Sequence, residues 1–356
     1  MTKFAVLTSG GDAPGMNSAV RAIAKICAGR GVEVVGAELG YEGLIDGNLR
    51  PLTLRREDGL TTPSEIDRCG GWGGTILGSA RSTRFRTSEG RAQAAATIAE
   101  HGIDGLVIIG GNGSLTGASI LSAEHGTPVV GIPASIDNDI GCTGSAIGVD
   151  TALNTIIDAC DRISDTASAH RRAFVVEVMG RDCGYLAMAS AIAAGADAVL
   201  MREQDRGEDG VIDAVEQTIR SGFERGKQRV LIIKSEGVSV PCTRLVRELN
   251  ARIEGDHVRA TVLGHVVRGG RPSYEDRRIA NRLAFQAVQA LSAGKVGTMT
   301  AWRPTVKNVE KTVDPSVALV PLSEMIAETQ KVLEGTSMVM KWRLQMMEHV
   351  AGVLGV

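Results

Sequence analysis

Two glycine-rich segments of this chain have the composition of anion-binding loops. They read TSGGDAPG at residues 8–15 and IGGNGS at residues 109–114, each between an apolar run and a helix-like pattern. Glycine lets backbone N–H groups approach an anion closely, and the helix that follows offers its positive end. The first segment is neither a Walker A loop nor a GxGxxG loop. A third segment, GGTILGSAR at residues 73–81, ends in Arg81. A tight β-α turn would explain either of the first two alone, but two of them favour phosphate binding.

An acidic segment, SIDND at residues 135–139, follows another apolar run and Pro133. If the chain is extended there, Asp137 and Asp139 point to the same side. One carboxylate could then meet a substrate hydroxyl while the other serves a metal close by. A solvated acidic turn is the alternative interpretation of this segment by itself.

Arginines stand beside further apolar runs, at strand ends where a ligand would bind. HRR at residues 170–172 precedes the run at residues 174–178, and MGR at residues 179–181 follows it. Glu236 follows another run, and residues 259–270 read RATVLGHVVRGG. Arginine is the preferred planar partner of phosphate oxygens, although most surface arginines, and most single histidines, have no such role.

The elements that must position these residues alternate between strand and helix. Apolar runs without polar alternation, such as residues 4–7, 106–109 and 129–132, indicate strands that are buried on both faces of a parallel sheet. Longer helical patterns lie between the runs, such as residues 16–28 and 151–164. This rhythm predicts an α/β protein with doubly wound, mostly parallel sheets. Because the rhythm restarts after the SIDND segment, we expect two lobes.

Composition excludes several classes of protein. The 356 residues carry 39 basic and 41 acidic side chains, for a net charge of −2, and only 3% are aromatic. Nucleic-acid binding usually needs a strongly basic face or stacking aromatics, so we expect no nucleic acid as partner. No stretch approaches the roughly eighteen apolar residues that span a bilayer. Six scattered cysteines without a CxxC pair fit free thiols in a reducing compartment, and we expect a cytoplasmic protein without membrane contact.

In combination and order, these motifs resemble those of the phosphofructokinase family. The resemblance runs from about residue 3 to about residue 275 and rests on LTSGGDAPGMN, GGTILGSAR, IGGNGS, SIDND, VVEVMGR and ATVLGHVVRGG. It implies a glycolytic enzyme that transfers a phosphoryl group from ATP, or in some branches from pyrophosphate, to the 1-hydroxyl of fructose 6-phosphate. It also implies two Rossmann-like lobes with the active site in the cleft. Residues 1–140 plus about 266–315 would bind the nucleotide, and residues from about 141 to 265 plus 316–356 the sugar phosphate.

The resemblance implies a role for each matching residue. Asp137 would be the general base that takes the proton of the sugar hydroxyl, and Arg181 would stabilise the charge that develops. The implied catalytic residues are Asp137, Ser135, Arg181 and Gly11. Those implied for the nucleotide phosphates are Gly11, Arg81, Ser82, Gly111, Asn112, Gly113 and Ser114. Those implied for the sugar phosphate are Ser135, Asp137, Arg172, Met179, Gly180, Arg181, Glu236, Arg259, His265 and Arg268.

Three positions indicate which phosphoryl donor the protein uses and how well it binds Mg²⁺. Pyrophosphate-using relatives carry a carboxylate at the position of Gly113 and often a Lys at that of Ala134, so this chain favours ATP. Ala134 nevertheless differs from the usual Gly of bacterial ATP-using relatives. Asn112 replaces the Asp that usually serves the Mg²⁺ site of the family, and an amide keeps an oxygen acceptor but removes a negative charge. We expect Asn112 and Asp139 to hold Mg²⁺, with lowered affinity.

The resemblance also bears on assembly and control. Arg172 and Arg259 match arginines that the family lends across a subunit interface, which implies a dimer or a tetramer. Bacterial relatives bind effectors such as ADP or phosphoenolpyruvate through cations at positions that match Arg21, Lys25 and Lys227. A solvated helix face is the alternative for Arg21 and Lys25.

Two other functions stay open at this point. One is a pyrophosphate-dependent enzyme of the same family. The other is a catalytically weakened, sugar-phosphate-binding regulatory homologue, which Asn112 suggests. The presence of Asp137 and Arg181 favours an active enzyme over that homologue.

Overall fold

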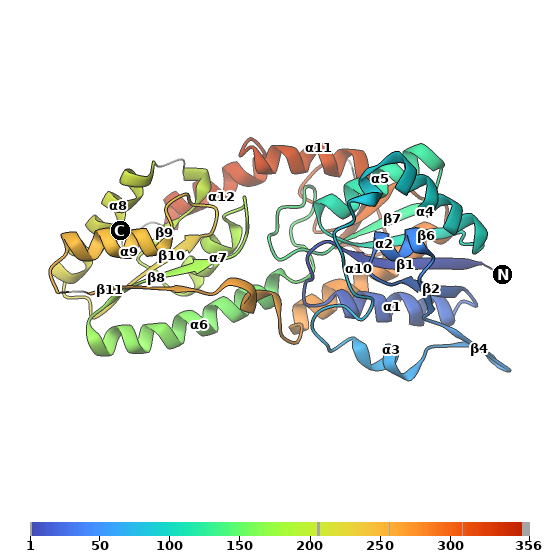
Figure 1. Ribbon diagram of the computed structural model, residues 1–356, viewed down its shortest axis with the longest axis horizontal. Helices are drawn as coiled ribbons and strands as arrows, with labels where there is room; N and C mark the ends of the chain where they lie inside the picture. Colours follow the sequence, from blue (N-terminus) through green and yellow to red (C-terminus); the bar gives the residue numbers. More distant parts are fainter. Residues whose placement is uncertain (1, 205–206, 256, 308, 351–356) are drawn as a thin grey trace. The chain divides into compact units, whose positions relative to one another are not determined.

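The computed structural model describes residues 2–204, 207–255, 257–307 and 309–350. The chain divides into two compact units, each with its own main sheet (Figure 1). Unit 1 comprises Met1–Ile136, Ile140–Thr151 and Arg268–Lys331, and unit 2 comprises Asp137–Asp139, Ala152–Val267 and Val332–Val356. These bounds differ from the expected lobes at residues 137–139, which lie in unit 2, at residues 266–267, and at residues 141–151 and 316–331. The latter residues lie in unit 1 because Val317–Pro321 pairs with a strand of its sheet.

Within the described residues, the main sheet of unit 1 has the strand order β13-β14-β12-β7-β6-β1-β2-β3. These strands are β1 (Lys3–Ser9), β2 (Glu33–Ala37), β3 (Leu49–Pro51), β6 (Gly105–Gly110), β7 (Val129–Pro133), β12 (Thr298–Trp302), β13 (Glu310–Lys311) and β14 (Val317–Pro321). From β12 to β2 the strands run parallel, and antiparallel pairs extend both edges. Every residue of β6 and β7 is buried, as expected for strands covered on both faces.

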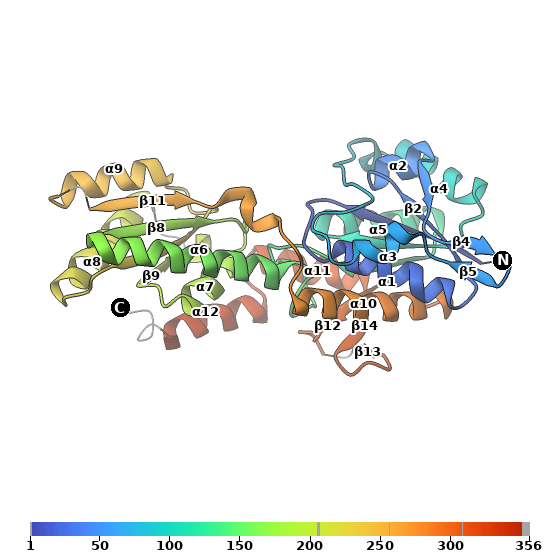
Figure 2. The ribbon, with the colours of Figure 1, turned by 90° about the horizontal axis from the view of Figure 1, so that it is seen from below.

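Helices cover both faces of this sheet (Figures 1 and 2). α1 (Met16–Ala28) and α10 (Tyr274–Ser292) pack together on one face, and α4 (Ser88–Glu100) and α5 (Asn112–His125) lie on the other. α1 confirms the helix predicted at residues 16–28. The remaining elements of this unit include α2 (Tyr41–Asp46), β4 (Leu54–Arg56), β5 (Gly59–Thr61), α3 (Ser64–Cys69), η1 (Arg84–Arg86) and α11 (Leu322–Leu333).

Over the described ranges of unit 2, the sheet consists of parallel strands in the order β11-β8-β10-β9. They are β8 (Ala173–Val178), β9 (Ala198–Leu200), β10 (Val230–Ser235) and β11 (Val258–Val262). The other elements are α6 (Val149–His170), α7 (Tyr185–Ala193), η2 (Arg202–Gln204), α8 (Glu208–Glu224), α9 (Cys242–Arg252), η3 (Gly264–Arg268) and α12 (Met338–Val350). α8 and α9 bury aliphatic side chains against β8, β10 and β11. Both units thus confirm the predicted α/β class.

All six cysteines are free and buried, three in each unit. Burial raises the pKa of each thiol, to about 11 for Cys69, Cys160 and Cys183 and to about 12 for Cys27, Cys142 and Cys242. At neutral pH these thiols are therefore protonated, and none has the character of a reactive nucleophile. Among the helices that the structure describes, none is long and apolar enough to cross a membrane.

Candidate active site

The carboxyl edge of the unit 1 sheet carries the first two glycine segments. β1 and β6 are neighbours, and from there the strand order continues to β2 on one side and to β7 on the other. Such a reversal opens a crevice at the carboxyl ends of the strands, where open α/β sheets bind ligands. The loop after β1 and the start of α5 after β6 flank this point.

The first glycine segment lies against an arginine from a distant part of the chain. Gly10 and Gly15 have φ of 89° and 112°, in the left-handed region that favours glycine. A β-carbon at Gly11 would lie 2.8 Å from Nη1 of Arg268. That side chain is buried, and the same nitrogen donates a hydrogen bond of 3.3 Å to the carbonyl of Asp12. The fold therefore brings two predicted site residues, Gly11 and Arg268, together in unit 1.

The second glycine segment is the first turn of α5. This helix begins at Asn112, directly after the extended cap residue Gly111. The N–H groups of a first helical turn lack partners within the helix, so this turn can bind an anion through its backbone. Gly113 is exposed, and a β-carbon there would meet no atom within 4 Å. Ser114 is buried in the same turn.

Ser135 adjoins this helix start. A β-carbon at Gly111 would lie 3.8 Å from the β-carbon of Ser135. Backbone hydrogen bonds hold the serine there, because the N–H of Ala134 donates to Gly110 and that of Ser135 to Ile147, each at 3.0 Å. Ser135 and the second glycine segment therefore share one edge of unit 1.

Hydrogen bonds join the third glycine segment to the first. The hydroxyl of Thr8 donates to the carbonyl of Gly78 at 2.8 Å, and that of Ser79 donates to the carbonyl of Gly10 at 2.6 Å. Arg81 follows directly and is exposed, so its guanidinium is accessible to a ligand. The first and third glycine segments are thus joined, and the second lies beside the first, because a β-carbon at Gly10 would lie 3.2 Å from Oγ of Ser114.

Ser82, also predicted to contact the nucleotide, has a structural role as well. Its hydroxyl accepts the N–H of Phe85 at 2.9 Å, at the start of η1. The Ser82 side chain is half-buried.

Asn17, which is not among the predicted site residues, holds the third segment in place. Its buried amide nitrogen donates to the carbonyls of Trp72 at 3.3 Å and Gly73 at 3.1 Å, and its Oδ1 accepts the N–H of Ile76 at 2.7 Å. An amide suits this task because it both donates and accepts. Its place in the LTSGGDAPGMN motif was the available signal, but no spacing rule points to its partners.

The acidic segment forms a turn whose residues 137–139 belong to unit 2, so the chain is not extended there and the condition for both carboxylates to share one face is not met. Asn138 has a φ of 51°, so the side chains of Asp137 and Asp139 do not follow strand alternation. Asparagine adopts this left-handed conformation more readily than most residues. Asp137 is only 3% exposed, whereas Asp139 is partly exposed. The two carboxylates therefore differ in their access to solvent.

The buried carboxylate of Asp137 faces Arg181. Nε of Arg181 lies 3.6 Å from Oδ2 of Asp137, and the arginine side chain is 51% exposed. A buried carboxylate beside a solvent-accessible guanidinium combines a proton acceptor with a cation that can contact an anionic ligand. The structure brings these two predicted residues together within unit 2.

Glu236 supports the turn that carries Arg181. Gly180 and Arg181 have φ of 140° and 49°, and Oε1 of Glu236 accepts their N–H groups at 3.1 and 2.7 Å. The family resemblance implies that Glu236 contacts the sugar phosphate, and the structure adds this role within the chain. Met179, just before the turn, is buried. His265 is exposed in η3, which follows the carboxyl end of β11 at the same edge of the sheet.

Two predicted arginines lie at the opposite edge of that sheet. Arg172 precedes β8, and Arg259 pairs with Phe174 near the start of the same strand, while Arg181 follows its other end. β8 has six residues, and at about 3.3 Å per residue it separates the two edges by roughly 20 Å. Within one chain, the structure therefore does not bring Arg172 and Arg259 to the Asp137–Arg181 pair.

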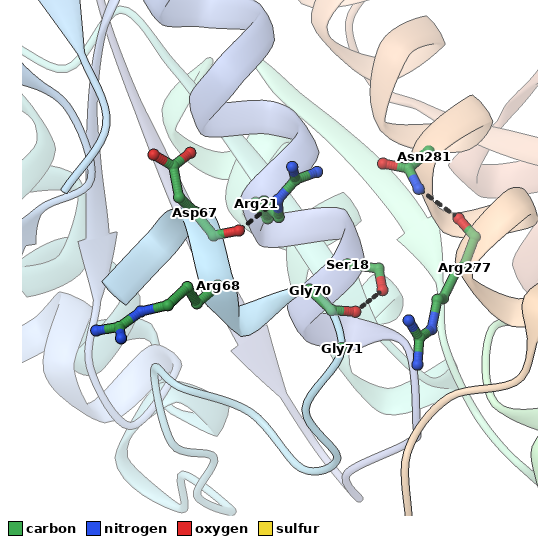
Figure 3. Close-up of a pocket in the computed structure, with 8 residues that line it drawn as sticks. All are labelled: Ser18, Arg21, Asp67, Arg68, Gly70, Gly71, Arg277 and Asn281. Atoms are coloured by element: carbon green, nitrogen blue, oxygen red, sulfur yellow. Dashed lines mark hydrogen bonds between the residues drawn. The ribbon is translucent and has the colours of Figure 1, made fainter. Parts of the chain in front are cut away.

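A pocket of about 180 Å³ lies in unit 1 beside α1, α3 and α10 (Figure 3). Its eight lining residues are Ser18, Arg21, Asp67, Arg68, Gly70, Gly71, Arg277 and Asn281. Three of them are arginines, which gives the pocket a positive lining. Arg21 donates from Nε to the carbonyl of Asp67 at 2.8 Å, and the ammonium of Lys25 pairs with the Asp67 carboxylate at 2.6 Å. Of the three predicted effector cations, Arg21 lines this pocket, whereas Lys227 pairs with Asp197 in unit 2.

In the part of the chain that the structure describes, no three His, Cys, Asp or Glu side chains group as a metal site. The predicted ligands are one carboxylate, Asp139, and one amide, Asn112. This donor set fits Mg²⁺ that arrives on substrate phosphates, because Mg²⁺ usually keeps several waters and takes only one or two carboxylates from the protein.

Comparisons with known proteins agree with one another. The family model described as Phosphofructokinase matches residues 3–291. The ATP-dependent 6-phosphofructokinase of Thermotoga petrophila is 49% identical over 301 residues, which cover 85% of this chain and 90% of that protein. ATP-dependent 6-phosphofructokinase 1 of Thermus thermophilus is 42% identical over 338 residues, which cover 92% of this chain and 100% of that protein.

Among solved structures, the phosphofructokinase of Pichia pastoris in the T-state matches with a TM-score of 0.83 and 33% sequence identity. The match covers 99% of this chain and 38% of the yeast chain. This chain therefore spans less than half the length of that relative.

Proposed function

The chain belongs to the phosphofructokinase family, and we propose that it transfers the γ-phosphoryl group of ATP to the 1-hydroxyl of fructose 6-phosphate. The products are fructose 1,6-bisphosphate and ADP, and the reaction is a step of glycolysis. The observation that carries the proposal is the buried Asp137 carboxylate, 3.6 Å from Nε of Arg181. We place the protein in the cytoplasm, where reducing conditions keep its six thiols free.

In the proposed mechanism, Asp137 acts as the general base and takes the proton of the 1-hydroxyl, which makes that oxygen a better nucleophile. Arg181 stabilises the negative charge on the transferred phosphoryl group, which is the main task in this chemistry. Its accessible side chain suits that contact, and Glu236 keeps its turn in place. The residues that we assign to fructose 6-phosphate are Ser135, Met179, Gly180, Glu236, His265 and Arg268.

We assign the ATP phosphates to unit 1. The first turn of α5 offers backbone N–H groups to the phosphates. The N–H of the buried Ser114 donates to the carbonyl of Gly111 at 3.0 Å, so this residue holds the shape of the turn. The free space at Gly113 favours ATP over pyrophosphate, because a carboxylate there would occlude and repel the α-phosphate. The residues assigned to the nucleotide are Gly11, Arg81, Ser82, Gly111, Asn112, Gly113 and Ser114.

We assign Mg²⁺ to Asn112, whose side-chain oxygen Oδ1 is buried, and to Asp139, which is partly exposed. When bound, the ion neutralises charge on the phosphates of ATP. With one carboxylate in place of two, the protein contributes less charge to the ion, and the ATP phosphates must supply most of the binding.

Asp137→Asn should lower kcat by roughly 10²–10⁴-fold, because an amide cannot take the hydroxyl proton, with smaller changes in KM. The measurement is a coupled assay of ADP formation with fructose 6-phosphate, repeated with pyrophosphate as donor. Asp158→Asn, at an exposed ion pair of α6, is the matched control and should behave as the wild type. Full activity of Asp137→Asn would refute the mechanism. A preference for pyrophosphate would refute the donor, and a wild type without turnover would favour the weakened homologue.

Asn112→Asp should lower the Mg²⁺ concentration needed for half-maximal rate, because it adds a negative charge at the proposed ion site. A Mg²⁺ titration at fixed ATP measures this change. Asn48→Asp, which adds the same charge at an exposed position, should leave the titration as it is. An unchanged midpoint for Asn112→Asp would show that this position does not serve the ion.

We further propose a dimer or tetramer in which Arg172 and Arg259 serve the site of a neighbouring copy, since their edge of the sheet lies far from Asp137 of the same chain. Mixing inactive Asp137→Asn with inactive Arg259→Ala under conditions that exchange subunits should then restore activity, because each hybrid pair contains one native site. Mixing Asp137→Asn with Arg181→Ala is the control and should restore no activity. Each site takes both of these residues from the same chain, so no hybrid contains a native site. Equal results for the two mixtures would contradict shared sites.

Anionic effectors such as ADP or phosphoenolpyruvate are assigned to the arginine-lined pocket that contains Arg21. Added effector should shift the dependence of rate on fructose 6-phosphate in the wild type and not in Arg21→Ala, with kcat unchanged. Arg56→Ala, at an exposed position of β4, should keep the wild-type response. Hyperbolic curves that neither compound moves would remove this assignment.

A further inference from the structure

Arg343, on α12, lies outside the stretch that resembles the phosphofructokinase family. Its side chain is only 5% exposed, although its neighbours Lys341 and Trp342 on the same helix are exposed. Burying a guanidinium costs free energy unless its donors are hydrogen-bonded. Its contacts therefore identify the part of the structure that it stabilises.

The guanidinium of Arg343 joins two segments of unit 2 that carry chemistry. Nη2 donates to the carbonyl oxygen of Asn138 at 3.3 Å. Nη1 donates to Sγ of Cys183 at 3.4 Å and to Sδ of Met340 at 3.5 Å. The guanidinium also stacks on the ring of Tyr185, 4.4 Å from its centroid.

These contacts fall directly beside the two reacting groups that we assign. Asn138 follows Asp137, and its φ of 51° is a sparsely populated conformation that surrounding contacts must maintain. Cys183 lies two residues after Arg181, and its N–H donates to the carbonyl of Gly180 at 2.9 Å, which closes the turn. The buried guanidinium of Arg343 therefore contacts both the turn that carries Asp137 and the turn that carries Arg181.

We propose that Arg343 is a positioning residue for the reaction. Through its hydrogen bonds to the carbonyl of Asn138 and the thiol of Cys183, it fixes the positions of Asp137 and Arg181 relative to each other. It acts through these neighbours and does not touch the substrate. This role rests on the proposed function, because it matters for catalysis only if Asp137 and Arg181 react as assigned. The alternative is that Arg343 only anchors α12.

Three variants separate these roles. Arg343→Met keeps length and removes the donors, Arg343→Lys keeps the charge and one donor group, and Lys341→Met removes an exposed charge from the same helix. We expect Arg343→Met to lower kcat by roughly 10–100-fold, the cost of a small misplacement of reacting groups, with KM for ATP unchanged. Arg343→Lys should recover part of kcat, and Lys341→Met should match the wild type. If Arg343→Met does not fold, Arg343→Lys carries the test, with a smaller loss of kcat in the same direction.

Hydrogen exchange supplies a readout that does not need activity. The peptide that covers residues 134–142 should exchange faster in Arg343→Met than in the wild type and Lys341→Met, while α1 exchanges alike in all three. If either kcat or the exchange of this peptide matches Lys341→Met, the proposal is overturned. If the wild type showed no turnover, the proposed function would be wrong. The comparison of hydrogen exchange would still decide whether Arg343 holds the turn at Asn138.

Discussion

The turn at Gly180 and Arg181 keeps its unusual conformation because a single carboxylate oxygen of Glu236 accepts both of its N–H groups. Glu236 follows β10 and the turn follows β8, and these two strands pair in parallel with their ends aligned. The acceptor and the donors therefore leave the sheet side by side. Since the position of Arg181 relative to Asp137 is set by this turn, the chemistry that we assign to unit 2 depends on two hydrogen bonds between neighbouring strand ends.

Strand direction explains which predicted residues meet and which do not. In a parallel sheet every carboxyl end lies at one edge, so motifs that follow strands gather there even when they are far apart in sequence. Arg181, Glu236 and His265 follow β8, β10 and β11 and share that edge. Arg172 and Arg259 belong to the starts of strands, and their distance from Asp137 in the same chain supports a function between copies.

The sequence predicted well what depends on local patterns. Apolar runs without alternation located the buried strands, and the helix at residues 16–28 has the predicted bounds because its apolar residues repeat at the helical period. Local patterns did not reveal the turn at Asn138, since a left-handed residue leaves no periodic trace. Nor did they reveal Asn17 or Arg343, because what identifies each one is a partner distant in the chain. Long-range hydrogen bonds of this kind are set by the packed structure.

The six buried cysteines can report local unfolding of the part of the chain around each of them. Cys27, Cys69 and Cys142 are enclosed in one unit and the other three cysteines in the second. A thiol-specific reagent can modify such a group only after the surrounding shell opens and the thiol ionises in water. The labelling rate at each cysteine thus reports the free energy of the opening that exposes it, so the local stabilities of the two units can be compared without introducing a cysteine by mutation.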